Sequence, residues 1–362
     1  MAVLPPSNPP SVPLPPQPEG VPWPTTGWPT ADPDPAVAQR LDELLDEAFS
    51  PGAADDANGV AATALDTEPF GSSLAFVAIH RGQLVAERYG PTAGPDEKLI
   101  SWSMAKSFTH ALIGVLAGES RLDIDAPAAI PAWSDPSDTR SAITIDHLLR
   151  MVPGTLFNED YVDDKTSHCI QMLFGDGKPD MAAYTAALDS ITEPNTQFNY
   201  SSGTTVLLCR ILADIVGSGQ AFEAWMNQTL LQPLGIDADL TFDEVGTWVG
   251  SSFLHASARD FAKFGLLYLR DGMWEGERLL PPGWVDYART MRAVDEEGGR
   301  YSAHWWINSG DEAVFYASGY ETQRIIVDPA ADLILVRLGK TSTALGQNVD
   351  AWLDRIRDLF RS

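Results

Sequence analysis

Ser103 and Lys106 are the residues whose types and spacing most directly predict chemistry, in the run Ser103-Met104-Ala105-Lys106. Residues at i and i+3 lie on one face of a helix, so this spacing brings the lysine amine within reach of the serine hydroxyl. A serine hydroxyl attacks a carbonyl carbon only when a neighbouring base takes its proton. A lysine serves as that base where burial or a nearby cation lowers its pKa, and the apolar residues that follow the pair favour burial. The pattern is short, so it needs partners elsewhere in the chain.

A second candidate is Tyr200, in the polar turn Phe198-Asn199-Tyr200-Ser201-Ser202-Gly203. The turn precedes an apolar helix predicted at 204–216, so the tyrosine can project into a cleft. Beside a lysine ammonium the pKa of its phenol is expected to fall, which makes it a usable acid and base. The alternative interpretation is a buried tyrosine that anchors a loop.

A third candidate is the run Tyr316-Ala317-Ser318-Gly319-Tyr320 near the C-terminal end. A glycine on an edge strand lets a substrate carbonyl approach the backbone. The backbone amides of Ser103 and Tyr320 are then expected to form a two-donor oxyanion hole. Taken alone, Gly319 is also explained as a glycine at a strand end.

In this order, the three elements resemble the serine β-lactamase and penicillin-binding superfamily, whose motifs are Ser-x-x-Lys, Tyr-x-Asn or Ser-x-Asn, and Lys-Thr-Gly. The chain is most similar to the class C-like branch, which includes family VIII carboxylesterases and 6-aminohexanoate-dimer hydrolases. The resemblance extends over roughly residues 70–360. It implies that Ser103 is acylated, that Lys106 activates it, and that Tyr200 passes protons to the leaving group and later activates water.

The resemblance also suggests substrate contacts and exposes two departures. Tyr161 lies on a loop that borders the cleft in this branch, and Trp305 and Trp306 are candidates for the acyl pocket, with core packing as the alternative. Ser202 stands where the second motif has Asn, and Ala317-Ser318-Gly319 stands where the third has Lys-Thr-Gly. The absent lysine removes a cation that pairs with a β-lactam carboxylate. We therefore expect weak or no β-lactamase activity.

Apolar periodicity and turn residues predict the elements that must position these residues. The predicted elements are a helix at 35–49, strands at 74–79 and 83–89, helices at 103–118, 145–151, 181–188, 204–216 and 257–271, strands at 314–318, 323–327 and 333–338, and a helix at 346–360. Tight turns join the strands, so the sheet is expected to be antiparallel and built from both chain ends around a helical insertion at about 120–255. This is an α+β fold of the β-lactamase/transpeptidase-like type.

The N-terminal residues 1–34 are predicted to be a proline-rich extended segment, followed by one hydrolase domain at 35–362. Thirteen of the 27 prolines fall within residues 1–35, a composition typical of polyproline-like chain. Trp23 and Trp28 suggest that its second half packs on the body. A loop of small residues is expected at 51–64.

Composition restricts the function classes. The formal net charge of −26 argues against nucleic acid and anionic membranes as partners. No secretion signal or membrane span is recognised, and two cysteines make no disulfide framework, so we expect a cytoplasmic protein. The six histidines are scattered and form no zinc-binding pattern, so no metal or cofactor is predicted. No Gly-x-Ser-x-Gly motif occurs, which argues against an α/β-hydrolase. Homo-oligomerisation is left open.

The sequence therefore favours a serine hydrolase that cleaves a small-molecule ester or amide through an acyl-enzyme on Ser103. The alternative is a catalytically weak relative that acts as a ligand-binding or scaffold protein. A cell-wall carboxypeptidase is a third hypothesis, but its substrate lies outside the cytoplasm.

Overall fold

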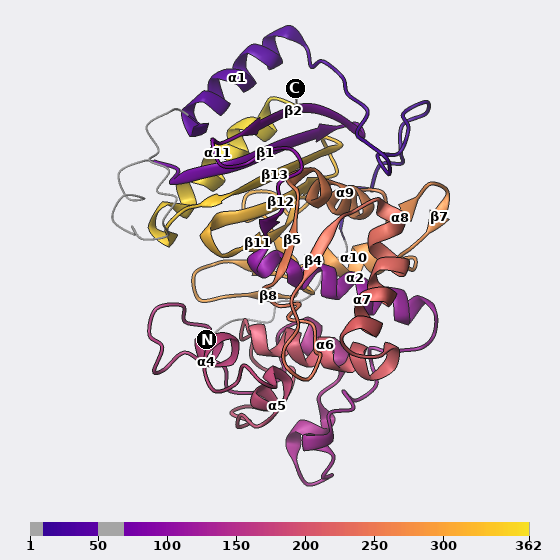
Figure 1. Ribbon diagram of the computed structural model, residues 1–362, viewed down its shortest axis with the longest axis vertical. Coiled ribbons are helices and arrows are strands. Elements are labelled where there is room, and N and C mark those ends of the chain that lie inside the picture. Colours follow the sequence, from indigo (N-terminus) through magenta and orange to yellow (C-terminus); the bar gives the residue numbers. More distant parts are fainter. Residues whose placement is uncertain (1–9, 50–68, 362) are drawn as a thin grey trace.

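The computed structural model describes residues 10–49 and 69–361. Its central element is an eight-stranded antiparallel sheet with strands from both ends of the chain (Figure 1). The strand order is β2-β1-β13-β12-β11-β10-β9-β8. These strands are β1 (Ser72–His80), β2 (Gln83–Tyr89), β8 (Ala293–Val294), β9 (Arg300–Tyr301), β10 (Trp306–Ile307), β11 (Phe315–Gly319), β12 (Gln323–Asp328) and β13 (Leu333–Lys340). The predicted α+β class is confirmed.

Helices cover both faces of the sheet. Side chains alternate between the two faces along each strand, and both faces carry apolar side chains that pack against these helices. On β1, Phe76 packs in a cluster with α1 (Pro35–Phe49) and α11 (Gly346–Asp358). Its neighbour Val77 belongs to the larger core cluster, shared with α2 (Ala105–Gly118) and α9 (Ala258–Leu269). The sheet is thus the middle layer of three, and α2 carries the Ser103 turn against its inner face.

The helices of the helical insertion are α3 (Ile145–Leu149), α4 (His168–Phe174), α5 (Met181–Ala186), α6 (Ser202–Val216), α7 (Gln220–Met226), the π-helical turn Asn227–Leu231 and α8 (Gln232–Leu234). In Figure 1, helices α4, α5 and α6 lie below the sheet, and α7 and α8 rise along the right side towards α9. Within the described residues no single helix has the length and hydropathy of a membrane span. The segments Ser202–Val216 and Gln220–Leu234 meet that test only jointly, with a bend of 92° between them.

Smaller elements complete the fold. A three-stranded sheet has the order β3-β5-β4, and a two-stranded one pairs β6 with β7. The strand bounds are β3 (Leu99–Ile100), β4 (Ala238–Leu240), β5 (Leu254–Ala256), β6 (Met273–Trp274) and β7 (Glu277–Arg278). The remaining α-helix is α10 (Trp284–Ala288). Strand β3 leads directly into the Ser103 turn.

The N-terminal segment, described from residue 10, lies against the body as an extended strap. The Trp23 ring centroid is 4.9 Å from that of Trp274. The Trp28 indole Nε1 donates to the Arg259 carbonyl at 3.1 Å. Further along, Thr30 forms a bridge with Leu84 of β2. The expected packing of both tryptophans is therefore confirmed.

Most predicted elements occur close to their expected bounds. Ser257 caps α9, because its side chain accepts from the Asp260 amide, and Gly272 follows in the left-handed region at φ 72°. The helix predicted at 145–151 ends earlier, at Leu149, since Met151 has a φ of 59°. Helices α4, α7, α8 and α10 were not predicted. The loop expected at 51–64 lies outside the described residues.

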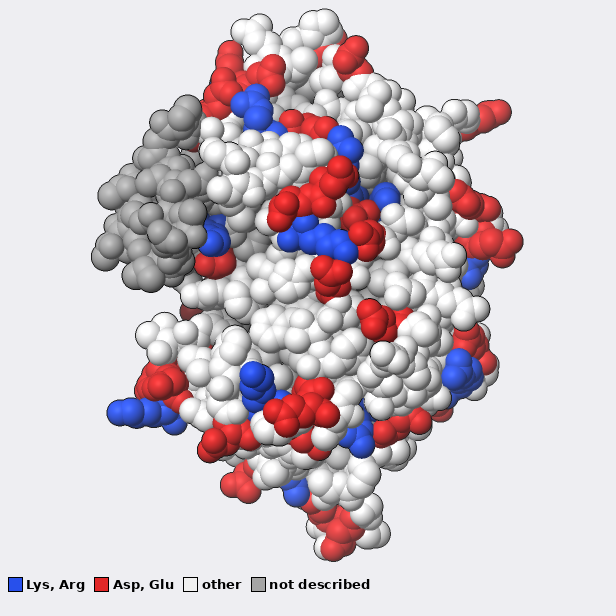
Figure 2. Space-filling view, in the orientation of Figure 1, with Lys and Arg blue, Asp and Glu red and all other residues white. Residues whose placement is uncertain are grey.

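The charged surface agrees with the acidic composition. On the face drawn in Figure 2, acidic side chains are scattered over the described residues with lysines and arginines interspersed among them. No extended basic patch is present on the described part of that face. This pattern gives a polyanion no continuous area to bind there.

Candidate active site

Ser103 lies in a strained turn that the small sheet holds in place. The 3₁₀ turn Trp102–Met104 precedes α2, and Trp102 has a φ of 44°, in the left-handed region that residues with a side chain rarely adopt. Just before it, the Ser101 amide donates to the Leu254 carbonyl of β5 at 2.8 Å. Anchoring at Ser101 therefore compensates for the strain at Trp102.

Lys106 is buried with its amine directed at the Ser103 hydroxyl. Its side chain is 1% exposed, and Nζ lies 3.0 Å from Ser103 Oγ. Two further oxygens surround Nζ: Ser202 Oγ at 2.9 Å and the Ser251 carbonyl at 2.9 Å. The i, i+3 spacing thus gives the hydrogen bond that the sequence predicts, and the amine has three oxygen partners.

Tyr200 is brought to the same place by the turn before α6. The Lys106 Nζ lies 4.9 Å from the centroid of its ring. Burial raises the pKa of the Tyr200 phenol above its usual value, and this outweighs the lowering effect of the Lys106 charge. The expectation that the pKa falls is therefore wrong. Removal from water destabilises the phenolate more than the nearby Lys106 charge stabilises it.

Glu159 is a functional candidate that the motif analysis missed. Its Oε2 accepts from the Ser202 amide at 2.7 Å, and its Oε1 accepts from Ser202 Oγ at 2.5 Å and from the Tyr161 hydroxyl at 2.9 Å. The only sequence signal is its position two residues before Tyr161. We call Ser103, Lys106, Ser202, Glu159 and the Ser251 carbonyl the lysine network.

Ser318 does not face Ser103. Its Oγ accepts from the Arg324 guanidinium at 2.8 Å, and Arg324 is paired with Asp350 of α11 at 2.9 Å. Alternation along β11 explains this direction: Ala317 packs in the inner core cluster, so Ser318 points to the opposite face. Of this segment, the backbone around Gly319 and the residue Tyr320 reach the site, whereas the Ser318 side chain does not.

Gly319 is required by a close approach of backbone rather than by an edge strand. Strand β11 is interior, paired with β12 on one side and, through Phe315 and Tyr316, with β10 on the other. A Cβ at Gly319 would lie 2.4 Å from the Ser101 carbonyl oxygen. The missing side chain therefore lets the strand end reach the Ser103 turn.

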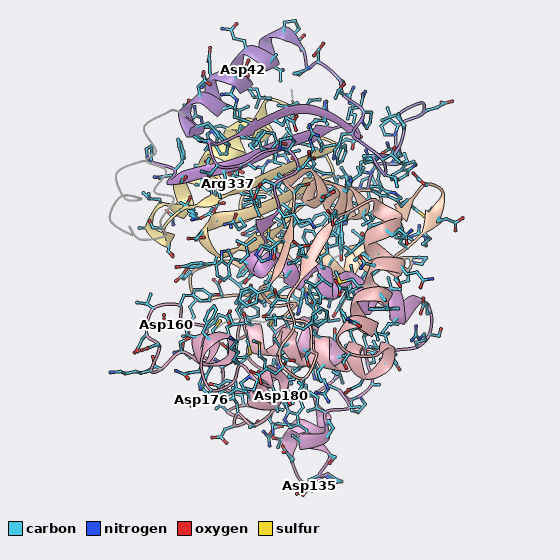
Figure 3. All side chains as sticks on the ribbon, viewed as in Figure 1. Asp42, Asp135, Asp160, Asp176, Asp180 and Arg337 are labelled. Carbon is cyan, nitrogen blue, oxygen red and sulfur yellow. The ribbon has the colours of Figure 1, made fainter. Side chains whose placement is uncertain are left out.

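Arg337, labelled in Figure 3, supports the turn that follows Gly319. Glu321 and Thr322 both have positive φ, 59° and 64°. The buried guanidinium donates to the carbonyls of both residues at 3.1 Å. Burial lowers the pKa of Arg337 to about 9. A cation from the central strand β13 thus holds the strained turn next to Tyr320.

A cavity of about 110 Å³ opens beside Ser103. It is mostly apolar, and its lining comprises Trp102, Ser103, Tyr161, Cys169, Ile170, Leu173, Phe174, Ser202, Ser252 and Tyr320. Four aromatic residues of this lining, together with Phe253, form a row of ring contacts that we call the aromatic rim: Phe174, Phe253, Trp102, Tyr320 and Tyr161, each ring centroid within 6.1 Å of the next. The site therefore combines a polar network, centred on the buried Lys106, with an apolar entrance.

The two tryptophans considered for the acyl pocket lie elsewhere. Trp305 is fully buried and packs on Tyr268 at 4.5 Å between ring centroids. Trp306 packs on the Tyr200 ring at 5.4 Å. Neither residue lines the cavity. Trp305 belongs to the core, and Trp306 contacts the Tyr200 ring outside the cavity lining. Tyr161, by contrast, does line the cavity.

Comparison with known families agrees with this arrangement. A family model described as "Beta-lactamase" matches residues 71–357. This chain belongs to the beta-lactamase family. It is a hydrolase of that family, and the match includes the Ser103 turn, the Tyr200 turn and strand β11.

Proteins similar to this chain point in the same direction. A 6-aminohexanoate-dimer hydrolase from Paenarthrobacter ureafaciens is 24% identical over 284 residues, 73% of this chain and 71% of that protein. A solved structure of a putative 6-aminohexanoate-dimer hydrolase from Bacillus anthracis has a TM-score of 0.71 at 22% identity, covering 98% of this chain and 91% of the other. A penicillin-binding protein homologue from Caulobacter crescentus has a TM-score of 0.64 at 16% identity, with 89% and 99% covered. The structural matches establish the fold.

Proposed function

We propose that this protein hydrolyses uncharged esters and small linear amides through an acyl-enzyme on Ser103. The observation that carries the proposal is the 3.0 Å contact between Lys106 Nζ and Ser103 Oγ, at the end of an apolar cavity. A hydroxyl beside a buried amine has a proton acceptor in place before substrate arrives.

In the proposed acylation, Ser103 Oγ bonds to the substrate carbonyl carbon and its proton passes to Lys106 Nζ. The bond from that carbon to the leaving oxygen or nitrogen breaks, and the leaving atom takes a proton from Tyr200, which Lys106 replaces. Because burial raises the pKa of Tyr200, the phenol is protonated at neutral pH and suits this donor role. In deacylation, water bonds to the acyl carbon, its proton passes through Tyr200 to Lys106, and Ser103 regains a proton as the carbon–Oγ bond breaks.

The negative charge that develops on the carbonyl oxygen needs hydrogen-bond donors. We assign this role to the amides of Ser103 and Tyr320, two residues that both line the cavity. The close approach of Gly319 to Ser101 brings their two backbone segments together.

The lining of the cavity supports an uncharged, apolar acyl group. Its described lining contains no arginine, lysine or histidine, and Ala317 stands where the third motif has lysine. A β-lactam carboxylate therefore has no cation to bind there, which supports esters over penicillins. The relative's name, 6-aminohexanoate-dimer hydrolase, supports small linear amides as further candidates.

Intact-mass analysis after reaction with a fluorophosphonate tests the proposal. The wild-type chain should gain one adduct as Ser103 Oγ displaces fluoride from phosphorus, and the Ser103→Ala variant should gain none. Turnover of p-nitrophenyl esters should disappear in the same variant and exceed nitrocefin turnover in the wild type. An unlabelled wild-type chain would instead support the ligand-binding alternative.

A further inference from the structure

The three partners of Lys106 pose a problem of hydrogen-bond direction. To act as a base, Lys106 must be a neutral amine with two N–H groups and one lone pair. The Ser251 carbonyl can only accept, so it takes one N–H. The hydroxyls of Ser103 and Ser202 can each donate or accept. If Ser202 donated to the amine, it would occupy the lone pair that Ser103 needs.

Glu159 removes this ambiguity. An ionised carboxylate accepts hydrogen bonds and donates none. Its Oε1 lies 2.5 Å from Ser202 Oγ, so the Ser202 hydroxyl donates its single hydrogen bond to Glu159. Towards Lys106, 2.9 Å away, Ser202 Oγ can then only accept. Both N–H groups of the amine are thereby assigned, and its lone pair is left for Ser103.

We propose that Glu159 is a positioning residue that, through the Ser202 hydroxyl, directs the lone pair of Lys106 at Ser103. The proposal rests on the function proposed above, in which Ser103 is the nucleophile. It also gives a chemical reason for serine at the position where the second motif has Asn. The Ser202 hydroxyl can act purely as an acceptor towards Lys106 only while the Glu159 carboxylate accepts the hydroxyl proton in a hydrogen bond.

The carboxylate is itself well held in the required orientation. Its Oε2 accepts from the Ser202 amide at 2.7 Å, at the first residue of the 15-residue helix α6. A helix N-terminus stabilises a negative charge. The Tyr161 hydroxyl adds a bond to Oε1 at 2.9 Å. Both carboxylate oxygens are therefore occupied by donors.

The Glu159→Gln variant isolates the effect because it conserves shape and changes hydrogen-bond direction. Ser202 presents two donors to the carboxylate, its amide and its hydroxyl. A glutamine offers one accepting oxygen and one donating NH₂. If the NH₂ faces the hydroxyl, Ser202 must turn its proton towards Lys106. If the NH₂ faces the amide, two donors collide and the loop is displaced.

The experiment measures the second-order rate of fluorophosphonate labelling. We expect Glu159→Gln to label about 10- to 100-fold more slowly than wild type, the loss associated with a hydrogen bond to a charged group. Asp160→Asn is the matched control, because it makes the same change on the adjacent residue, labelled in Figure 3, whose carboxylate accepts from the Val162 amide. This control should label at the wild-type rate.

A second variant distinguishes control of the hydrogen-bond direction between Ser202 and Lys106 from a purely structural role of Glu159. Ser202→Ala removes the competing donor, so the amine lone pair can accept only from Ser103. We therefore expect Glu159→Gln/Ser202→Ala to label faster than Glu159→Gln alone and as fast as Ser202→Ala. A double variant as slow as Glu159→Gln would overturn the proposal, as would Glu159→Gln labelling at the wild-type rate. Failure of the wild-type chain to label would instead refute the proposed function.

Discussion

The two parts of the candidate site, the lysine network and the aromatic rim, are built on opposite principles. In the network, Lys106 is 1% exposed and each polar atom has a specific partner. In the rim, Tyr161 and Tyr320 are each 41% exposed and Phe174 is 61% exposed. The centroids of neighbouring rings lie 5.1 to 6.1 Å apart. Such ring contacts do not impose one hydrogen-bonding geometry on a ligand.

This difference separates chemistry from selectivity. A buried network tolerates few changes, since a polar atom that loses its partner in a dry site is costly. An exposed apolar rim recognises substrate mainly by area, and each CH₂ group contributes about 0.8 kcal/mol when buried. We therefore expect variants of the network to change the rate with every substrate, and variants of the rim to change the order of preference among substrates.

The largest effect is expected from Lys106→Met. Methionine conserves much of the length of the side chain but cannot accept a proton, and loss of a general base costs about 10²- to 10⁴-fold. We expect this loss in kcat/KM for every p-nitrophenyl ester in a series from acetate to hexanoate. Lys165→Met, an exposed lysine on the loop that carries Glu159, is the control and should retain activity. A loss confined to the longer esters would contradict the division between network and rim.

Tyr200→Phe is expected to have the next largest effect, about 10- to 100-fold in kcat/KM, because it removes one hydrogen-bonding proton donor from the reacting centre. The variant also tests the protonation state. The pKa of Tyr200 is raised, so the phenol should stay protonated up to its ordinary value near pH 10 and beyond.

The measurement is an ultraviolet titration of tyrosinate in wild type and in Tyr200→Phe. The two curves should coincide below pH 10 and differ only above it. A tyrosinate that forms below pH 10 in the wild type and is missing from the variant would show that the cation outweighs burial. That result would restore the expectation drawn from sequence.

Local patterns predicted the parts of the fold that depend on neighbours in the chain. The period of α9 and the Ser257 cap, and the i, i+3 spacing of Ser103 and Lys106, involve residues at most a few turns apart. Tight turns also predicted the antiparallel pairing of β1 with β2 and of β11, β12 and β13 in succession. These signals need only the geometry of one helix or hairpin.

The features that were missed depend on contacts across the chain or on burial. Glu159 meets Ser202 across 43 residues, and no motif links them. The direction of the Tyr200 pKa shift depends on how far the ring is removed from water, which neighbouring residues do not reveal. Ser318 is different: alternation within β11 could have placed its side chain on the outer face, away from Ser103.

The smallest expected effect belongs to the rim. Phe174→Ala removes a ring from the cavity lining whose own exposure leaves it little role in stability. We expect kcat/KM for p-nitrophenyl hexanoate to fall about 3- to 10-fold while that for acetate stays unchanged, because only the longer chain buries CH₂ groups against the ring. Ile191→Ala, which truncates an apolar side chain that is 51% exposed and does not line the cavity, is the matched control. An equal loss with acetate and hexanoate would mean that Phe174 acts on the reacting centre itself, and the rim would then belong to the chemistry as much as the lysine network does.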